Sequence, residues 1–366
     1  MSVGTEPVGR NEATLWGLTP AERLARLARE QGLAQGRTDD VVLVNLDFVF
    51  DPAWLRLAAD EPDRIIARDG VPVLARVARD VRAEIRQAMA EGRPATAANG
   101  VVSVEWKDFG EVENRVLRKR ERPFLERLTP ATRPVIERLS YNASYKGVTD
   151  LLTKYLWPEW AFHLTRLAAR LGVSPNAVTT IGALLCALAG YAFWHGWYWS
   201  GIAAGLVFMV LDTVDGKLAR CTITSSWWGN VFDHGIDLVH PLLWWWAWAE
   251  GLHEYGRPLE PDLFAAVMIA LVAGYDVQRA IEGAFIVQFG IHIHVWRPLD
   301  SQFRLVTARR NPNMVILVAS LALGRPDDGL VAVAGWTALS CLFHLVRLVQ
   351  AWLARARGGA IESWLA

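Results

Sequence analysis

The sequence predicts an all-α integral membrane bundle of about six transmembrane helices with a juxtamembrane amphipathic helix, preceded by a small cytosolic α/β domain. Hydrophobic residues make up 52% of the 366 residues, and 21% are charged. This mixture is too apolar for an ordinary soluble protein and too charged for one wholly buried in a membrane. Apolar and charged residues must therefore occupy different parts of the chain. We place the boundary between the two domains, 1–145 and 146–366, at residue 145.

Residues 1–145 show the pattern of the α/β domain. Short apolar runs at Val41 to Leu46, Arg64 to Arg68 and Val101 to Trp106 predict strands, and the Ala/Arg-rich stretches between them predict helices. The first residues contain no apolar stretch that could act as a signal peptide. We therefore expect the N-terminus to stay in the cytosol.

Residues 157–171 predict the juxtamembrane helix. Trp157, Trp160, Leu164, Leu167 and Leu171 recur at helical spacing, and basic side chains lie between them. This pattern is typical of a helix in the plane of the membrane interface. An ordinary amphipathic core helix would give the same pattern.

Six apolar segments after residue 175 predict the transmembrane helices. They are residues 177–196, 200–219, 229–250, 263–288, 312–325 and 329–353. With the N-terminus inside, the cytosolic side receives the basic residues Lys217, Arg220, Arg297, Arg304, Arg309, Arg310, Arg355 and Arg357. This distribution agrees with the positive-inside rule. It predicts a multi-pass protein of the inner, cytoplasmic membrane whose active site faces the cytosol.

Composition also limits the partners. The formal net charge of +0 indicates no nucleic-acid-binding surface. Cys186, Cys221 and Cys341 lie far apart, so they predict neither a disulfide framework nor a C-x-x-C metal site. Most of the tryptophans in and around the apolar segments lie near the ends of the predicted spans, where indole rings favour the headgroup region. This set includes Trp194, Trp197, Trp199, Trp227, Trp228 and the run Trp244 to Trp246.

Four aspartates stand at the end of the second apolar segment and the start of the third. Asp212 and Asp215 are spaced i, i+3, and Asp233 and Asp237 are spaced i, i+4. Each pair lies on one helical face, so two antiparallel helices can direct all four carboxylates to one point. Charged groups in an apolar setting are costly and usually functional. Divalent cations such as Mg²⁺ or Mn²⁺ would neutralise the cluster, and a carboxylate-plus-phosphate shell is the usual way Mg²⁺ is held.

Small and basic residues between the aspartates suit a pyrophosphate. Gly216 and Gly229 let a nucleotide or pyrophosphate approach the backbone closely, and Ala219 adds only a small side chain to the helix surface. The guanidinium of Arg220 can donate two hydrogen bonds to a phosphate. Each residue taken singly has another explanation, since glycine and alanine in a span often serve packing and Arg220 could set topology. The four aspartates together have no comparable structural explanation.

The pattern D-x-x-D-G-x-x-A-R-x8-G-x-x-x-D-x-x-x-D resembles the signature of the CDP-alcohol phosphotransferase (CDP-alcohol phosphatidyltransferase) family. All eight fixed positions match, namely Asp212, Asp215, Gly216, Ala219, Arg220, Gly229, Asp233 and Asp237. The resemblance implies two divalent metals held by Asp212, Asp215 and Asp233, and a CDP moiety bound along the same motif. It also implies that Asp237 is the general base for an alcohol acceptor and that CMP is the leaving product.

Basic residues after the fourth apolar segment predict a phosphate-bearing acceptor. Arg304, Arg309 and Arg310 lie on the same side of the membrane as the aspartates, and arginine forks suit phosphate. Attraction of these residues to anionic lipid headgroups explains the same observation. Within the family, this stretch is most similar to the branch that uses inositol phosphate. Two short outlying motifs also resemble family positions that line the pocket: Ser174 to Thr179, and Lys146-Gly147 with Asp150.

The N-terminal domain is similar to part of a sugar-nucleotide cytidylyltransferase, a domain fused to some relatives in the family. VVLVNLDFVFDP and DGVPVLARV carry this similarity. No Gly-rich phosphate loop of the LxAGxGxR type precedes Val41 in the sequence, which leaves Asp47 without a phosphate cradle. We therefore expect a degenerate domain that stabilises or positions the membrane unit.

Two alternatives to this function stay open at the level of sequence. A transporter or channel could also use intramembrane carboxylates. Within the enzyme class, the donor could be CDP-diacylglycerol or a CDP-polyol, and a phosphatidylglycerophosphate-type synthase would carry the same motif. The family resemblance further implies a homodimer packed through its membrane helices.

Overall fold

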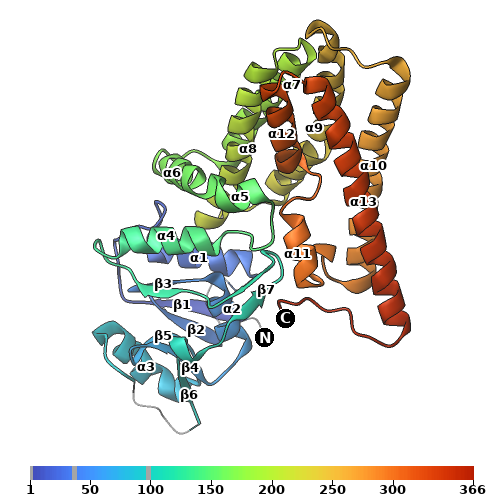
Figure 1. The fold of residues 1–366 in the computed structure, drawn as a ribbon. Helices are drawn as coiled ribbons and strands as arrows, with labels where there is room; N and C mark the ends of the chain where they lie inside the picture. The colour runs from blue at the N-terminus through green and yellow to red at the C-terminus, as the bar shows by residue number, and fades with distance from the viewer. Residues whose placement is uncertain (1–2, 35–38, 96–99) are drawn as a thin grey trace.

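A computed structural model describes residues 3–34, 39–95 and 100–366, so small parts of the predicted N-terminal domain lie outside the described residues. The chain forms an α/β region below and a helical region above, as drawn in Figure 1. The α/β region contains the early strands and helices, and the helical region contains the long helices that follow residue 150. The prediction of a small α/β region followed by a mostly helical membrane part is therefore confirmed.

The centre of the α/β region is a five-stranded sheet with the order β1-β2-β5-β4-β6. β1 pairs in parallel with β2, β4 pairs in parallel with β6, and the central pairs are antiparallel. The strands are β1 Gly4–Val8, β2 Val41–Asn45, β4 Arg64–Arg68, β5 Val71–Arg76 and β6 Val102–Glu105. Three of them coincide with the runs predicted from sequence. β2 is buried along its whole length, which explains its continuous apolar sequence.

Three helices accompany the sheet, and local sequence explains where two of them begin. Thr19 and Glu22 form a capping box at the start of α1 (Pro20–Glu30), and the Asp51 side chain caps α2 (Pro52–Asp60). The third helix is α3 (Arg79–Glu91), which ends at Gly92 in the left-handed conformation. Asp47 forms an ion pair with Arg127 at 2.7 Å.

Short elements lead from the sheet to the helical region. β3 (Phe48–Phe50) pairs with β9 (Leu125–Arg127), and β7 (Val112–Asn114) pairs with β8 (Lys119–Glu121). A single 3-10 turn, η1 (Trp106–Asp108), precedes β7, and α4 (Arg133–Ala143) follows β9. The predicted boundary at residue 145 lies just after α4.

The helical region begins with α5 (Leu151–Tyr155) and α6 (Trp157–Arg170). A helix then coincides with each of the six apolar segments predicted from sequence, although α7 and α12 end two and three residues before the predicted ends. They are α7 Pro175–Trp194, α8 Tyr198–Cys221, α9 Trp227–Glu254, α10 Pro261–Phe289, α12 Arg310–Ala322 and α13 Pro326–Ala356. η2 (Ile293–Val295) and α11 (Pro298–Arg304) form the connection after α10.

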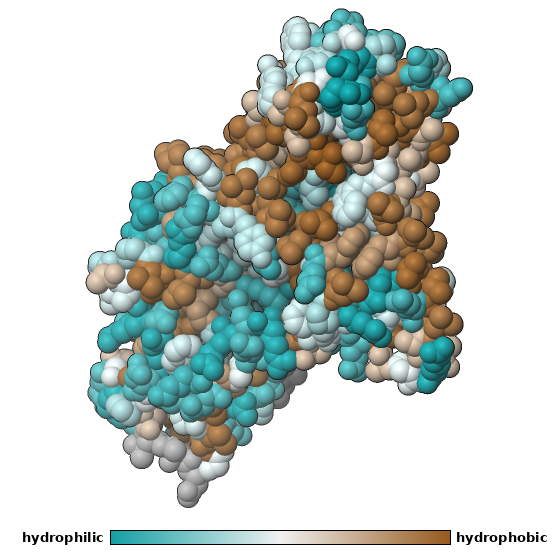
Figure 2. All heavy atoms as spheres, viewed as in Figure 1, coloured by the Kyte–Doolittle hydropathy of each residue, from teal (hydrophilic) through white to brown (hydrophobic). Residues whose placement is uncertain are grey.

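Among the described residues, three helices are long and apolar enough to cross a membrane: α7, α10 and α13. Figure 2 shows apolar side chains gathered over the helical region and hydrophilic side chains over the α/β region. The structure thus supports a multi-pass membrane protein. α8 and α9 carry the charged motif, and α12 has 13 residues, so these helices fall outside that set.

The juxtamembrane segment forms α6, as predicted. Four members of its predicted stripe, Trp160, Leu164, Leu167 and Leu171, are exposed, with Trp160 at 66% and Leu171 at 69% of full accessibility. The fifth, Trp157, is 5% exposed and packs in the core of the helical region. The opposite face, including Ala161 and Phe162, is buried against the rest of the chain. An ordinary core helix would bury its apolar stripe, so the exposed stripe favours the interfacial interpretation.

The tryptophan prediction is wrong for two residues. Trp194, Trp197 and Trp199 are exposed, but Trp244 and Trp245 are buried in the core of the helical region. The indole of Trp244 donates a hydrogen bond to the carbonyl of Cys186 at 2.9 Å, so this ring satisfies its polar atom inside the bundle.

All three cysteines have free thiols.

The two regions share a hydrophobic core. Leu15 and Trp16 of the α/β region pack in one cluster with Tyr141, Val214 and Leu218. Below this cluster, Arg23 donates a hydrogen bond to the carbonyl of Cys221 at 3.0 Å and Arg26 to that of Thr222 at 2.7 Å. These contacts satisfy carbonyls at the C-terminal end of α8. The α/β region therefore fixes the end of the helix that carries the first aspartates.

Candidate active site

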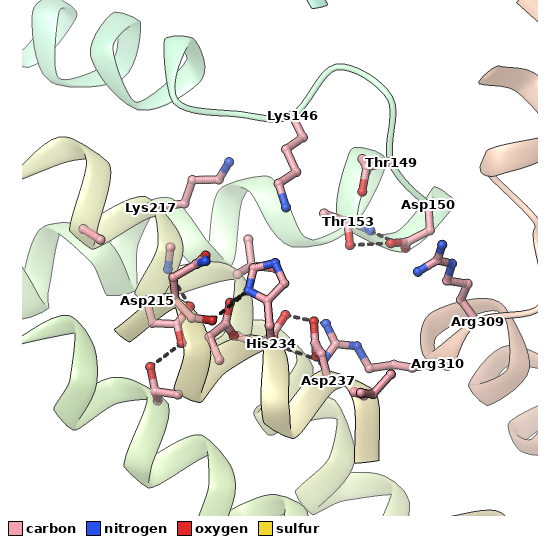
Figure 3. A pocket seen from close by; sticks show the side chains of 18 of the residues that line it. Lys146, Thr149, Asp150, Thr153, Asp215, Lys217, His234, Asp237, Arg309 and Arg310 are labelled. Atoms are coloured by element: carbon pink, nitrogen blue, oxygen red, sulfur yellow. Dashed lines mark hydrogen bonds and ion pairs between the residues drawn. The ribbon is translucent and has the colours of Figure 1, made fainter. Parts of the chain in front are cut away.

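A pocket of about 700 Å³ lies where the helical region meets the α/β region. Such a volume is typical of a small-molecule site. Its wall includes all eight positions of the motif and residues from both regions. Figure 3 shows charged side chains from several elements converging on this space.

α8 and α9 position the four aspartates as the sequence predicts. Asp212 and Asp215 lie in the last turns of α8, and Asp233 and Asp237 lie in the first turns of α9. The Ser226 side chain caps the start of α9 by accepting a hydrogen bond from the backbone of Gly229 at 3.0 Å. We call these four aspartates the acidic side of the pocket.

Three of the four carboxylates meet. Oxygen atoms of Asp212, Asp233 and Asp237 all lie within 4.8 Å of one another. The Arg310 guanidinium bridges two of them, donating to Asp212 at 3.0 Å and to Asp237 at 2.7 Å. Arg310 thus contacts the acidic side, where it offsets part of the repulsion among the carboxylates.

Asp215 is held slightly apart from this trio. Its carboxylate accepts a hydrogen bond of 2.6 Å from the hydroxyl of Thr179 on α7. Thr179 is 8% exposed, and the bond joins α7 to α8 at the floor of the pocket. The geometry therefore groups Asp237 with Asp212 and Asp233 and places Asp215 beside them.

The acidic side fits a divalent cation. Its ligand atoms are carboxylate oxygens, which Mg²⁺ and Mn²⁺ prefer. Together the four carboxylates carry more negative charge than the single bridging Arg310 can balance. A bound cation would supply the missing positive charge.

The smaller motif positions also line the pocket. A Cβ atom at Gly229 would lie 2.8 Å from the Asn176 side chain, so glycine allows α9 to approach the start of α7 closely. At Gly216 a Cβ atom would meet the flexible Arg220 guanidinium at 3.1 Å. Arg220 itself donates to the carbonyl of Ser144 at 3.0 Å. Ala219 completes this part of the wall.

Cations gather on another part of the wall, which we call the basic side. It consists of Arg118, Lys146, Arg279, Arg304 and Arg309. Its acidic member is Glu282, which accepts two hydrogen bonds of 2.6 Å from Arg309 and pairs with Arg279 at 3.2 Å. Arg309 is therefore already engaged. By contrast, the buried Nε and Nη1 atoms of Arg304 have no hydrogen-bond partner among the described residues.

Lys146 belongs to the basic side, and its charge also interacts with those of Asp212 and Asp233. Figure 3 shows its side chain pointing into the pocket from the segment that follows α4. Burial, together with the neighbouring Arg118 and Arg220, lowers the pKa of Lys146 to about 8. The pocket therefore contains a lysine whose charge changes close to neutral pH.

The two weak outlying motifs also reach the pocket. Lys146 and Asp150 line it, as do Asn176 and Thr179. The Asp150 carboxylate caps α5 and accepts a hydrogen bond from Asn311 at 2.8 Å.

Sequence reasoning missed Arg118, Arg279 and Glu282. For Arg279 and Glu282 a signal was present, since both are charged residues inside the fourth predicted apolar segment, where charge is costly. Arg118 gave no such signal, because it lies in an Arg/Glu-rich stretch of the α/β region.

Residues 172–343 match the family model described as CDP-alcohol phosphatidyltransferase. This match agrees with the family resemblance of the membrane part, and it contains all eight positions of the motif. Cholinephosphotransferase 1 of Gallus gallus is 33% identical over 123 residues, which cover 31% of this chain and 35% of that protein. Archaetidylinositol phosphate synthase of Pyrococcus horikoshii is 42% identical over 72 residues, which cover 19% of this chain and 37% of that protein.

The chain thus spans little more than a third of the length of these curated relatives. Among solved structures, a phosphatidylinositol phosphate synthase of Mycobacterium tuberculosis with CDP-DAG bound is 19% identical, with a TM-score of 0.41. That likeness covers 51% of this chain and 92% of the other.

Proposed function

We propose that this chain transfers a substituted phosphate from a CDP-linked donor to an alcohol and releases CMP, in phospholipid or inositol-phosphate biosynthesis. The observation that carries the proposal is the meeting of Asp212, Asp233 and Asp237 on the wall of the pocket, inside the segment that matches the family.

Asp212, Asp215 and Asp233 would hold two divalent ions, Mg²⁺ or Mn²⁺. Bound there, the ions would neutralise charge on the donor's pyrophosphate. Asp215 already accepts a hydrogen bond from Thr179, which fixes the direction of its carboxylate. Gly216, Ala219, Arg220 and Gly229 form the adjacent wall and would bind the CDP moiety.

Asp237 is the proposed general base. Its side chain is 43% exposed, compared with 15% for Asp212, so an acceptor hydroxyl can reach it from the pocket. It would take the proton from that hydroxyl as the oxygen attacks phosphorus. Arg310 donates a hydrogen bond to Asp237 at 2.7 Å and so fixes the direction of its carboxylate.

For the acceptor we propose a phosphate-bearing alcohol, with an inositol phosphate favoured. Of the three arginines predicted from sequence, Arg304 has the strongest support, because two of its buried nitrogen atoms have no hydrogen-bond partner among the described residues. Arg309 is held by Glu282, and Arg310 is held by the aspartates. CDP-diacylglycerol and a CDP-polyol both stay open as donors.

We further propose six spans in the cytoplasmic membrane, formed by α7 to α10, α12 and α13, with the N-terminus and the pocket facing the cytosol. A homodimer packed through these helices and a domain boundary at residues 145/146 belong to the same proposal. The α/β region would be a degenerate nucleotidyltransferase-like domain. A transporter or channel would need carboxylates along a path through the bundle, whereas these aspartates share a pocket with Arg118 of the α/β region.

The test is CMP release by the protein purified in detergent with Mg²⁺ or Mn²⁺. CDP-diacylglycerol and CDP-inositol would each be paired with inositol phosphate, glycerol phosphate and inositol. We expect release that depends on one of these acceptors. Donor hydrolysis or silence across the panel, while the protein still binds metal and CDP, would contradict the proposed reaction.

A further inference from the structure

The β7–β8 hairpin belongs to the α/β region, yet its tip forms part of the pocket. The two strands pair from Val112 with Glu121 to Asn114 with Lys119. Between them the chain turns through residues 115–118, and two residues of this turn, Val116 and Arg118, line the pocket. A region expected only to support the membrane unit therefore reaches the candidate active site.

Backbone contacts fix the hairpin tip against the segment that follows α4. Gly147 donates a hydrogen bond to the carbonyl of Leu117 at 2.9 Å, and Val148 donates to that of Arg118 at 3.2 Å. A Cβ atom at Gly147 would lie 2.6 Å from Cβ of Lys119 and 2.7 Å from the carbonyl oxygen of Arg118. Glycine at position 147 is thus required for this close approach.

Arg118 adopts a backbone conformation that is unusual for a residue with a side chain. Its φ angle is +51°, in the left-handed region that favours glycine. Strain of this kind persists only where surrounding contacts enforce it, and it often occurs at functional sites. Here the enforcing contacts are the hydrogen bonds to Gly147 and Val148 described above.

Within the part of the chain that the structure describes, the Arg118 side chain has no hydrogen-bond acceptor. Among the described residues, none forms a hydrogen bond or ion pair with its guanidinium. Its charged neighbours are Arg309, Arg304, Lys146 and Glu282, and His292 also lies nearby. Glu282 is already engaged by Arg309 at 2.6 Å and Arg279 at 3.2 Å. Positive charge on this side of the pocket therefore exceeds the available negative charge.

Arg304 provides an independent sign of a missing anion. It is 8% exposed and lines the pocket, and its buried Nε and Nη1 atoms have no hydrogen-bond partner in the described part of the chain, although its charge interacts with the Asp150 carboxylate. Buried guanidinium donors without acceptors are costly, so a ligand that supplies acceptor oxygens would be stabilised there. A phosphate offers such oxygens to two arginines at once.

We propose that Arg118, supplied by the hairpin of the α/β region, binds a phosphate group of the acceptor together with Arg304. This inference rests on the proposed transferase function and adds to it a substrate-binding role for the α/β region. The donor's pyrophosphate belongs at the acidic side, whereas Arg118 is surrounded by the basic side. Its role is therefore to select a phosphorylated acceptor over the free alcohol.

The experiment compares Arg118→Gln with Arg115→Gln, a matched variant on the same hairpin. Arg115 is exposed and pairs with Glu113, and it does not line the pocket. Binding of inositol phosphate and of inorganic phosphate would be measured by calorimetry, and KM for donor and acceptor by CMP release. We expect Arg118→Gln to weaken phosphate binding and raise the acceptor KM about tenfold or more, the effect of one charged hydrogen bond. Arg118→Lys should restore part of the loss.

Three results would overturn the inference. They are equal binding by Arg118→Gln and Arg115→Gln, a higher KM for the donor in place of the acceptor, and no phosphate binding by the unaltered protein. Equal thermal stability of the two glutamine variants would exclude a folding defect as the cause of weaker binding. If the unaltered protein binds phosphate but shows no transfer, the proposed reaction fails while the binding result still decides the role of Arg118.

Discussion

The acidic side of the pocket comes from two consecutive helices, whereas the basic side comes from segments spread along the chain. Asp212 to Asp237 lie at the facing ends of α8 and α9. Arg118 comes from the hairpin, Arg279 from α10 and Arg304 from α11. The two sides also differ in pairing, since Arg310 bridges two aspartates, whereas two buried nitrogen atoms of Arg304 have no hydrogen-bond partner among the residues that the structure describes. This difference suits two separate roles: the transfer reaction at the acidic side and selection of the substrate at the basic side.

The largest effect is expected from a substitution on the acidic side. Asp237→Asn should reduce kcat about 10²- to 10⁴-fold, the usual contribution of a general base, while donor binding is largely kept. Asp276→Asn is the matched control, because Asp276 is an exposed aspartate of α10 outside the pocket. Single-turnover assays and titration with a donor analogue would measure the two quantities. Normal turnover by Asp237→Asn would remove Asp237 from the role of base.

A smaller effect is expected from the basic side. Arg304→Gln should raise KM for a phosphorylated acceptor by about tenfold or more, with little change in donor KM. Arg357→Gln serves as the control, since Arg357 is exposed after α13. If Arg304 serves only to attract lipid headgroups, the two variants should have the same acceptor KM. An acceptor KM that rises in Arg304→Gln but not in Arg357→Gln, with the same dependence on anionic lipid in both, would support the pocket role of Arg304.

The charge of Lys146 should make anion binding sensitive to pH. Its pKa of about 8 means that the ammonium form, which attracts anions, is lost as pH rises through that value. We expect KM for an anionic substrate to rise several-fold between about pH 7 and 9. Lys146→Gln should flatten this profile, whereas Lys154→Gln, on exposed α5, should leave it unchanged. A profile of the same shape in all three proteins would show that another group titrates.

The smallest predicted effect concerns the floor of the acidic side. Thr179→Val removes the hydroxyl that orients Asp215 at 2.6 Å, and activity should fall a few-fold, as expected for one hydrogen bond. Thr180→Val, one residue along, removes an exposed hydroxyl that bonds to the carbonyl of Asn176. Activity and metal affinity of the two variants should separate them. Equal values would mean that Asp215 needs no such orientation.

The acidic side could be predicted from the sequence because it depends on the spacing of residues that are close together in the chain. The aspartate spacing fixes which helical faces carry the carboxylates, and the strands β2, β4 and β6 follow from short apolar runs in the same way. The close approach of the β7–β8 hairpin to Gly147 depends on contacts between residues far apart in sequence, which periodicity does not encode. Trp244 and Trp245 were misassigned for a similar reason, because neighbouring helices decide whether a tryptophan near a helix end is buried.

Metal dependence of transfer tests the central claim most directly. The measurement is acceptor-dependent CMP release by the purified protein before chelation, after removal of divalent metal, and after return of Mg²⁺ or Mn²⁺. We predict that release stops on chelation and returns with metal, because the carboxylates of Asp212, Asp215 and Asp233 then regain their counter-charge. Release that continues at the original rate in metal-free protein would contradict the role assigned to the acidic side.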